Sequence, residues 1–440
     1  MILNILCILA LFPAFYPLSL LIKKRDVNLF DFIILFHTLN FVVSPLIYGY
    51  RLNLDEGIVY DEFFYYISFI LVVLAMSAFW HEKYEDNVSI INVTKFIGGY
   101  NSLNISLLGR ILLFVAIVVS LVFYLPRATY ILHSEDYTPD VDYQAKSLVA
   151  VWGTIWSLLG IVFSMSLVLS YKNKIYNKID LFMSISYFVM LGFFPRRFFL
   201  LGILFLFVVL YSIYREAITK KLLGLAASFG IVFYLIYFPF YNVMRNSNFI
   251  FDSNHPIESL YGIVSNAVDN WNYRNTDESA AGATSNRSLG LYTALYDLIK
   301  NNPDPKNGEL TYEAIDVSLP KVINPHKGDG PEPTLEKMTK RYIDQADSFL
   351  LHSYGELHYW GFIFAALLYL FIFCLYNAYS KIWQNIFQVN LVPFYISFLM
   401  ISLVWNVEGG VNSNFSWFFT SLITLIVIYI VEHFEIIKLK

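Results

Sequence analysis

Charged residues and cysteine are both scarce in this chain. Only 15% of the 440 residues are Asp, Glu, Lys or Arg, whereas 57% are hydrophobic, and this balance excludes an ordinary soluble domain. The formal net charge of -4 provides no basic surface for nucleic acid, so we expect no nucleic-acid partner. The two cysteines, Cys7 and Cys374, both lie in apolar runs, which excludes a disulfide framework and a zinc site.

Several chemical motifs are missing as well. The sequence contains no Walker loop, no dinucleotide-binding fingerprint and no H-E-x-x-H or acidic-pair metal signature, so we expect neither a metal ion nor another cofactor. It also shows no internal repeat and no inverted pair of Gly/Pro-broken apolar stretches. Such repeats are typical of many transporters, so their absence weakens an interpretation as a transporter.

What the chain does have is a series of long apolar stretches. A helix that crosses a bilayer needs roughly 17–25 residues that are mostly apolar. Such stretches lie near residues 2–22, 30–49, 63–81, 109–128, 147–170, 179–195, 197–214, 222–243, 356–379, 389–406 and 415–433. The sequence therefore predicts an all-α, polytopic membrane protein with about eleven transmembrane helices, the first of which is retained rather than cleaved.

The positions of Lys and Arg predict how these helices are oriented. Four basic segments fall on one side of the predicted membrane: 23-KKRD-26, 172-KNKIYNK-178, 215-REAITKK-221 and the tail 438-KLK-440. Basic loops are retained in the cytoplasm, so we expect this side to be cytoplasmic. The acidic loops 51–62 and 133–146 fall on the other side. With eleven helices, the N-terminus is expected outside the cell and the C-terminus inside it.

One connection is much longer than the others. Residues 244–355 separate the predicted helices 1–8, in residues 1–243, from helices 9–11, in residues 356–440. We expect this extracytoplasmic loop to be partly helical, because apolar residues recur at helical spacing in 285–302 and again in 333–345. Connections of this length are usually lids or binding elements, so the loop is a candidate for function.

Basic residues gather at the predicted outer face, where they are not expected. They are Arg196, Arg197, Arg245, Arg287, Lys321 and Lys327. Arginine binds phosphate oxygens through paired donors, and a pyrophosphate at the membrane surface is the anion that we predict for this cluster. Pro195 precedes the arginine pair and breaks the helix there, which favours a water-filled pocket. The alternative is that these side chains reach lipid headgroups or pair with carboxylates of the loop.

Three further residues are candidates for proton transfer. His352 is the sharper candidate for a general base, since imidazole titrates near neutral pH. Glu356 follows it by four residues, so a helix would place both on one face. Glu408 lies in the Gly-rich interruption 405-WNVEGGVNSN-414, where it would orient an arginine, bind a sugar hydroxyl or act as a base. His352 and Glu408 each have a purely structural alternative, as a hydrogen-bonded interfacial histidine and a solvated turn glutamate.

This layout resembles that of the Wzy-type polysaccharide repeat-unit polymerases, also called O-antigen polymerases, which are similar in architecture to O-antigen ligases. The resemblance rests on the late outer loop, on 320-PKVINPHK-327 and on 355-GELHYWG-361. It also rests on the positions of Arg196 or Arg197 at a helix start, of Arg245 and Arg287 around the loop, and of Glu408 in the last outer turn. In this family, outer-face arginines hold the pyrophosphate of a lipid-linked glycan.

The resemblance implies a metal-independent glycosyltransferase in the bacterial cytoplasmic membrane. It would join undecaprenyl-pyrophosphate-linked oligosaccharide repeat units into a surface polysaccharide at the outer face. The implied partners are these lipid-linked glycans, membrane lipids and a polysaccharide chain-length regulator. Two alternatives stay open: an O-antigen ligase that transfers finished glycan to lipid A-core, and a flippase for lipid-linked oligosaccharides.

Overall fold

The computed structural model of the chain describes part of its length. The described residues are 3–38, 41–42, 71–72, 75–76, 98–128, 142–191, 196–222, 224–225, 228, 255, 258, 261–262, 265, 294–319, 323–340, 348–387, 389–404 and 410–439. For residues 3–9, 121–128, 142–157, 196–201, 402–404 and 420 only the backbone is described. These ranges include most of the predicted helices, so the arrangement of the fold can be followed through them.

The described part of the chain is mostly helical. Its helices are α1 (Leu3–Ile22), α2 (Leu29–Thr38), α6 (Leu107–Ala128), α7 (Asp142–Asn173), α8 (Lys178–Leu191), α9 (Arg196–Ile213), α14 (Glu309–Ser318), α15 (Glu332–Thr339), α16 (Phe349–Leu357), α17 (Gly361–Phe387), α18 (Val392–Val404) and α19 (Val411–His433). Two short 3₁₀ helices, η4 (Arg215–Ala217) and η7 (His358–Trp360), follow α9 and α16. The strands β1 (Leu103–Ile105) and β2 (Ile437–Leu439) form an antiparallel pair in which Leu103 lies opposite Leu439.

The core of the bundle is built around α18. Every residue from 391 to 401 is buried, and the helix packs against α2, α7, α9, α17 and α19. A helix that is apolar on all sides requires neighbours on all sides, which explains its central place. Aromatic edge-to-face contacts contribute to this packing, for example Phe205 of α9 on Phe398 of α18, whose ring centroids are 4.9 Å apart.

Where the chain is described, the predicted apolar stretches largely coincide with observed helices, and the stretches 63–81 and 222–243 lie mostly outside the described residues. The starts of α1, α6, α8, α9, α18 and α19 lie within four residues of the predicted starts. The ninth stretch, predicted from residue 356, needs correction: α16 ends at Leu357, His358 has a positive φ of 50°, and α17 begins at Gly361. The antiparallel pair of β1 and β2 was not predicted either, because three-residue strands leave almost no pattern in a sequence.

The predicted helices of the long loop are partly described. Residues 294–301 are helical, and Leu295, Tyr296 and Ile299 are buried there, as the spacing predicted. The second predicted helix is present as α15, with Pro333 in its first turn and with Leu335 and Met338 buried. It ends earlier than predicted, at Thr339, because Lys340 adopts a left-handed conformation. The helix α14 was not predicted.

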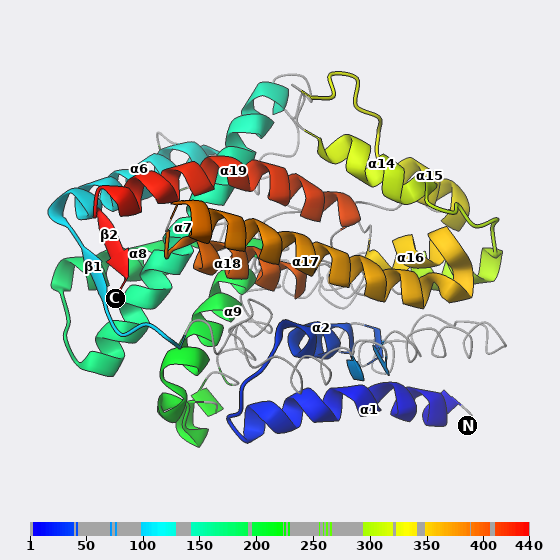
Figure 1. The fold of residues 1–440 in the computed structure, drawn as a ribbon, viewed down its shortest axis with the longest axis horizontal. Helices are drawn as coiled ribbons and strands as arrows, with labels where there is room; N and C mark the ends of the chain where they lie inside the picture. Colours follow the sequence, from blue (N-terminus) through cyan, green and yellow to red (C-terminus); the bar gives the residue numbers. More distant parts are fainter. Residues whose placement is uncertain are drawn as a thin grey trace.

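The bundle has two distinct ends (Figure 1). At the left of the figure lie β1, β2 and the C-terminus, and α1 ends on the same side; we call the segments 23–26, 172–178, 215–221 and 435–439 the basic end. At the right lie α14, α15 and α16, which we call the loop end. The start of α1 also lies at the right, so the first helix begins at one end and the chain finishes at the other.

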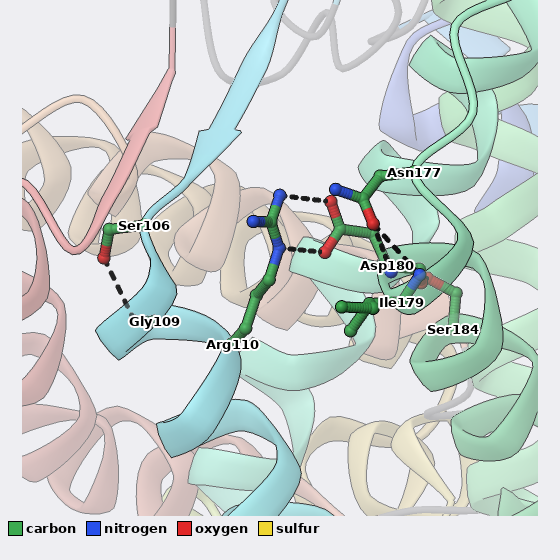
Figure 2. Close-up of polar contacts among 7 residues, drawn as sticks. All are labelled: Ser106, Gly109, Arg110, Asn177, Ile179, Asp180 and Ser184. Atoms are coloured by element: carbon green, nitrogen blue, oxygen red, sulfur yellow. Dashed lines mark hydrogen bonds and ion pairs between the residues drawn. The ribbon is translucent and has the colours of Figure 1, made fainter.

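An ion pair links two helices near the basic end (Figure 2). Arg110, in the first turn of α6, binds Asp180 of α8 with both arms of its guanidinium group: Nε to Oδ1 at 2.7 Å and Nη2 to Oδ2 at 3.0 Å. The Asn177 side chain accepts a hydrogen bond from the Ile179 amide at 2.9 Å and so caps the start of α8. The start of α6 is thereby fixed to the start of α8.

Two helical segments of the described chain are long and apolar enough to cross a bilayer. They are Phe349–Phe387, which includes α16 and α17, and Val411–His433, which is α19. The other apolar helical segments, among them Ala10–Ile22, Leu107–Ser120 and Leu158–Asn173, are shorter where the side chains are described.

Candidate functional site

The loop end brings two of the predicted site residues together. His352 and Glu356 lie on the same face of α16, with His352 Nε2 at 3.6 Å from Glu356 Oε1, and both side chains are fully buried. Ser348 precedes the helix as its N-cap, and its hydroxyl oxygen accepts a hydrogen bond from the Leu351 amide. All eight residues from Phe349 to Glu356 are buried, so this segment is part of the protein interior.

Glu356 caps the helix α14, which begins 47 positions earlier in the chain at Glu309. Its carboxylate accepts hydrogen bonds from the backbone amides of Gly308 and Thr311, the second at 2.6 Å, and from the Thr311 hydroxyl at 2.7 Å. The first amides of a helix have no partner within the helix, and a carboxylate at this position also interacts favourably with the helix dipole. Glu356 therefore joins α14 to α16.

Thr311 connects Glu356 to His352. The Thr311 hydroxyl has a single proton, which it donates to Glu356, and its oxygen lies 3.0 Å from His352 Nε2. His352 must then donate its Nε2 proton to Thr311, which assigns the neutral tautomer with an unprotonated Nδ1. That Nδ1 atom is buried and has no hydrogen-bond partner in the described part of the chain. The three side chains form one relay from imidazole to hydroxyl to carboxylate.

Close backbone contacts support this junction. The amides of Lys306 and Asn307 donate to the carbonyl oxygens of Gly355 and Glu356, both at 3.0 Å. Gly355 allows the helices to approach, because a Cβ atom there would lie 2.9 Å from Leu310 of α14 and 3.3 Å from Leu335 of α15. The glycine in 355-GEL-357 thus has a packing explanation, because a larger residue would require the Leu310 side chain to move.

The far side of α14 carries the Pro-rich loop. Asp316 accepts hydrogen bonds from the side-chain amide of Asn324 at 2.7 Å and from the Gly328 amide at 3.2 Å. Lys327, a predicted pyrophosphate ligand, donates from Nζ to the carbonyl oxygen of Val317 at 2.8 Å, in the last turn of α14. The ammonium group therefore interacts with the negative end of this helix. His326 is exposed beside it.

α14 also contacts the start of the last helix. Ser318 donates a hydrogen bond to the Asn412 carbonyl oxygen of α19 at 2.8 Å. Five residues earlier in α14, burial raises the pKa of the Glu313 carboxyl above its usual value, although a hydrogen bond from Thr334 of α15 opposes the shift. The loop end is therefore a layer of three short helices that rests on α19 and on the start of α17.

Aromatic stacking fixes α16 to the bundle below it. The rings of Phe349 and Tyr369 are parallel to within 13°, with centroids 4.2 Å apart. The Tyr369 hydroxyl lies 3.3 Å from Nε2 of His37 on α2. Through these contacts the first residue of α16 is connected to α17 and α2, so His352 has a defined position relative to the bundle.

The other predicted site residues are placed only in part. Arg196 and Arg197 are the first two residues of α9, as predicted, and only their backbone is described. Arg245, Arg287, Lys321 and Glu408 lie outside the described residues. The proximity of the arginines to one another, and their role in binding pyrophosphate, thus stay predictions.

Thr311 and Asp316 were missed by the sequence analysis. The segment 308-GELTYEAIDVS-318 does contain a signal, since Gly308 precedes apolar positions Leu310 and Ala314 that are both buried. The contacts that give Thr311 and Asp316 their importance join residues 45 and 8 positions apart. Helical periodicity does not contain that information.

Comparison with known proteins gives no match: no family model fits the chain, and no curated protein and no solved structure resembles it at a significant level.

Proposed function

We propose that this chain is a membrane glycosyltransferase that polymerises undecaprenyl-pyrophosphate-linked oligosaccharide repeat units. The observation that carries the proposal is the loop end, where three helices of the long insertion cover the ends of α17 and α19. There, the buried side chains of His352 and Glu356, which the sequence predicted as catalytic residues, are connected through the Thr311 hydroxyl. A polar site at the end of an apolar bundle fits a lipid-linked glycan, because the lipid part can lie along the bundle while the sugar part reaches the polar site.

The membrane part of the proposal is supported by the outer surface of the bundle. On α6, the side chains of Leu108, Ile111, Leu112 and Val115 are all more than 45% exposed. Such an apolar surface is unfavourable in water and favourable in contact with lipid. The basic end then faces the cytoplasm, because basic segments are retained there. The loop end faces the opposite side, at the outer surface of the bacterial cytoplasmic membrane. About eleven helices would span the bilayer, given its thickness.

The proposed reaction is a displacement at a sugar carbon. A hydroxyl of the acceptor repeat unit attacks the anomeric carbon of the donor glycan, and the bond from that carbon to the pyrophosphate oxygen breaks. The acceptor hydroxyl loses its proton to a base, and undecaprenyl pyrophosphate leaves with the bonding electrons. Negative charge develops on the leaving group, so Arg196, Arg197, Arg245 and Arg287 would stabilise the transition state there.

The geometry suggests different roles for the two described candidates. Glu356 is committed to capping α14, so we assign it a positioning role. His352 is held in the tautomer whose Nδ1 is unprotonated, which is the state that a general base requires. Because its side chain is fully buried, the loop end must open before an acceptor hydroxyl can reach Nδ1. Glu408 is the second candidate for the base.

The test is the glycolipid profile of a strain that lacks the gene. The strain is complemented with the wild-type gene, with Arg196→Ala/Arg197→Ala, and with Arg25→Ala as a matched control. Arg25 is an exposed arginine of the basic end, so its loss should leave the product unchanged. We expect single repeats in the deletion strain, a ladder of chain lengths with wild type and Arg25→Ala, and single repeats again with the double variant at equal protein level.

Two results would overturn this proposal. An unchanged ladder in the deletion strain would remove polymerase activity, and a full ladder with the double variant would remove the pyrophosphate site at the start of α9. Long chains left on the carrier lipid would instead identify a ligase.

A further inference from the structure

A second polar site lies at the basic end, far from the loop end along the bundle (Figure 1). A cavity of about 520 Å³ is lined by Asp26, Gly98, Lys172, Ser212, Ile213, Tyr214, Arg215 and Glu216. Cavities of this size are in the range that small ligands occupy. Nothing in the proposed transfer reaction uses these residues.

The charges that line this cavity are balanced. Arg215 is paired with Asp26, and its Nη1 also donates to the Lys24 carbonyl oxygen at 3.0 Å. Its guanidinium lies over the Tyr211 ring, 5.4 Å from the centroid, so the group is held on three sides. The remaining two charges, Lys172 and Glu216, have no partner in the described part of the chain. The cavity thus has one ammonium group and one carboxylate that are available to bind a ligand.

Three helix C-termini meet at the same place. α1 ends at Ile22, α7 at Asn173 and α9 at Ile213, and all three are within four residues of a residue that lines the cavity. After α1 the chain turns back on the helix, because the Lys24 amide donates to Leu21 and the Arg25 amide to Leu20. Helix C-termini carry partial negative charge, which favours a bound cation near Glu216. Lys172, whose ammonium has no partner among the described residues, favours an anion beside it.

An exposed apolar stripe on α1 ends at Ile22, four residues before Asp26, which lines the cavity. Phe12, Phe15, Leu18 and Ile22 are 70%, 59%, 42% and 80% exposed, and their spacing places them on one face of the helix. The opposite face, with Ala10, Ala14 and Leu20, is buried in the bundle. An apolar stripe that runs to a charged cavity matches a molecule with an acyl chain and a polar headgroup.

We propose that this cavity binds the headgroup of a zwitterionic phospholipid with a primary amine, phosphatidylethanolamine. The phosphate lies at Lys172 beside Arg215, the ammonium at Glu216, and an acyl chain along the α1 stripe. A zwitterionic headgroup would pair its phosphate with Lys172 and its ammonium with Glu216. A purely anionic headgroup would leave Glu216 unpaired, and its negative charge would repel that carboxylate. The inference rests on the proposed insertion into a membrane and is independent of the transferase chemistry.

The experiment measures lipid binding to the purified full-length protein by native mass spectrometry. Phosphatidylethanolamine, phosphatidylglycerol and phosphatidylcholine with identical acyl chains are added in competition to wild type, Lys172→Ala, Glu216→Gln and Lys178→Ala. Lys178 is an exposed lysine of the same end that does not line the cavity, so Lys178→Ala is the matched control.

We expect wild type and Lys178→Ala to prefer phosphatidylethanolamine. Glu216→Gln should lose that preference by roughly tenfold, the factor expected for one charge-assisted hydrogen bond, while it still binds phosphatidylglycerol. Lys172→Ala should weaken the binding of all three lipids, because they share the phosphate. Free phosphoethanolamine, which lacks acyl chains, should not displace the lipid.

Each opposite result overturns the inference. A wild-type preference for phosphatidylglycerol would identify a surface that binds anionic lipids in general. If Lys172→Ala and Glu216→Gln behaved like Lys178→Ala, neither Lys172 nor Glu216 would bind the headgroup. Displacement by free phosphoethanolamine would identify a soluble ligand. Since no glycan substrate is present, these outcomes are separate from the glycolipid ladder that tests the transferase.

Discussion

At and near the basic end the ion pairs keep contact with water, whereas at the loop end the His352–Glu356 pair is fully buried. The side chains of Arg110 and Asp180 are 25% and 13% exposed, those of Arg215 and Asp26 are 28% and 44% exposed, and those of Lys438 and Glu435 are 43% and 69% exposed. His352 and Glu356 have no exposed surface at all. The two ends therefore use charge for different purposes.

The difference follows from the cost of removing a charge from water. A half-exposed ion pair contributes little to the free energy of unfolding, and its loss costs little, because water solvates the charge that remains. A buried carboxylate has no such substitute and is stable only where several donors surround it. Glu356 has three donors, from Gly308 and Thr311, and each donor is in turn satisfied by Glu356. Substitution of Glu356 should therefore have a far larger effect than substitution in the partly exposed pairs at and near the basic end.

The largest effect is expected for Glu356→Ala. The substitution leaves two amides and a hydroxyl without their acceptor, and unsatisfied buried groups cost roughly 1–3 kcal/mol each. We expect the free energy of unfolding to fall by about 4 kcal/mol, with α14 detached from α16. Equilibrium unfolding in detergent measures the first effect, and amide hydrogen exchange over residues 309–318 measures the second.

A matched control is available on α14 itself. Glu309 pairs with Lys306 at 3.0 Å, but its side chain is 53% exposed. Glu309→Gln should change stability by less than about 0.5 kcal/mol. If the two substitutions had equal effects, the distinction between buried and exposed carboxylates would not hold in this protein.

An intermediate effect is expected for the pair shown in Figure 2. Arg110→Ala and Asp180→Asn should each lower the free energy of unfolding by about 1 kcal/mol, since the pair is bidentate but partly exposed. The double variant should lose little more than either single variant, and this cycle isolates the energy of the pair. Additive losses would instead show that each side chain acts through other neighbours.

Much of the helical framework could be predicted because apolar length is a local property. The predicted start of α9 near residue 197 and of α6 near residue 109 differ from the observed starts by one and two residues. Local spacing also predicted that His352 and Glu356 share a face. These features depend only on residues within a few turns of one another.

The parts that could not be predicted depend on distant partners. The boundary between α16 and α17 depends on the positive φ of His358, whose ring also binds the Pro303 carbonyl oxygen. The cap of α14 depends on Glu356, and the pair of β1 and β2 joins residues from opposite parts of the chain. A single sequence does not show which distant residue will satisfy a given donor, so α14 and Thr311 were missed.

The smallest effect is expected for Lys438→Ala at the basic end. Lys438 pairs with Glu435, both side chains are largely exposed, and the backbone of Lys438 is already fixed by its place opposite Asn104 in the strand pair. We expect a loss of less than about 0.5 kcal/mol, and none in 1 M salt, where the screening length is about 3 Å. Equilibrium unfolding at low and high salt measures both. A loss of unfolding free energy as large as that of Arg110→Ala, or one that persists in high salt, would mean that the exposed pair holds β1 against β2. The contrast between the two ends would then depend on the number of hydrogen bonds rather than on burial.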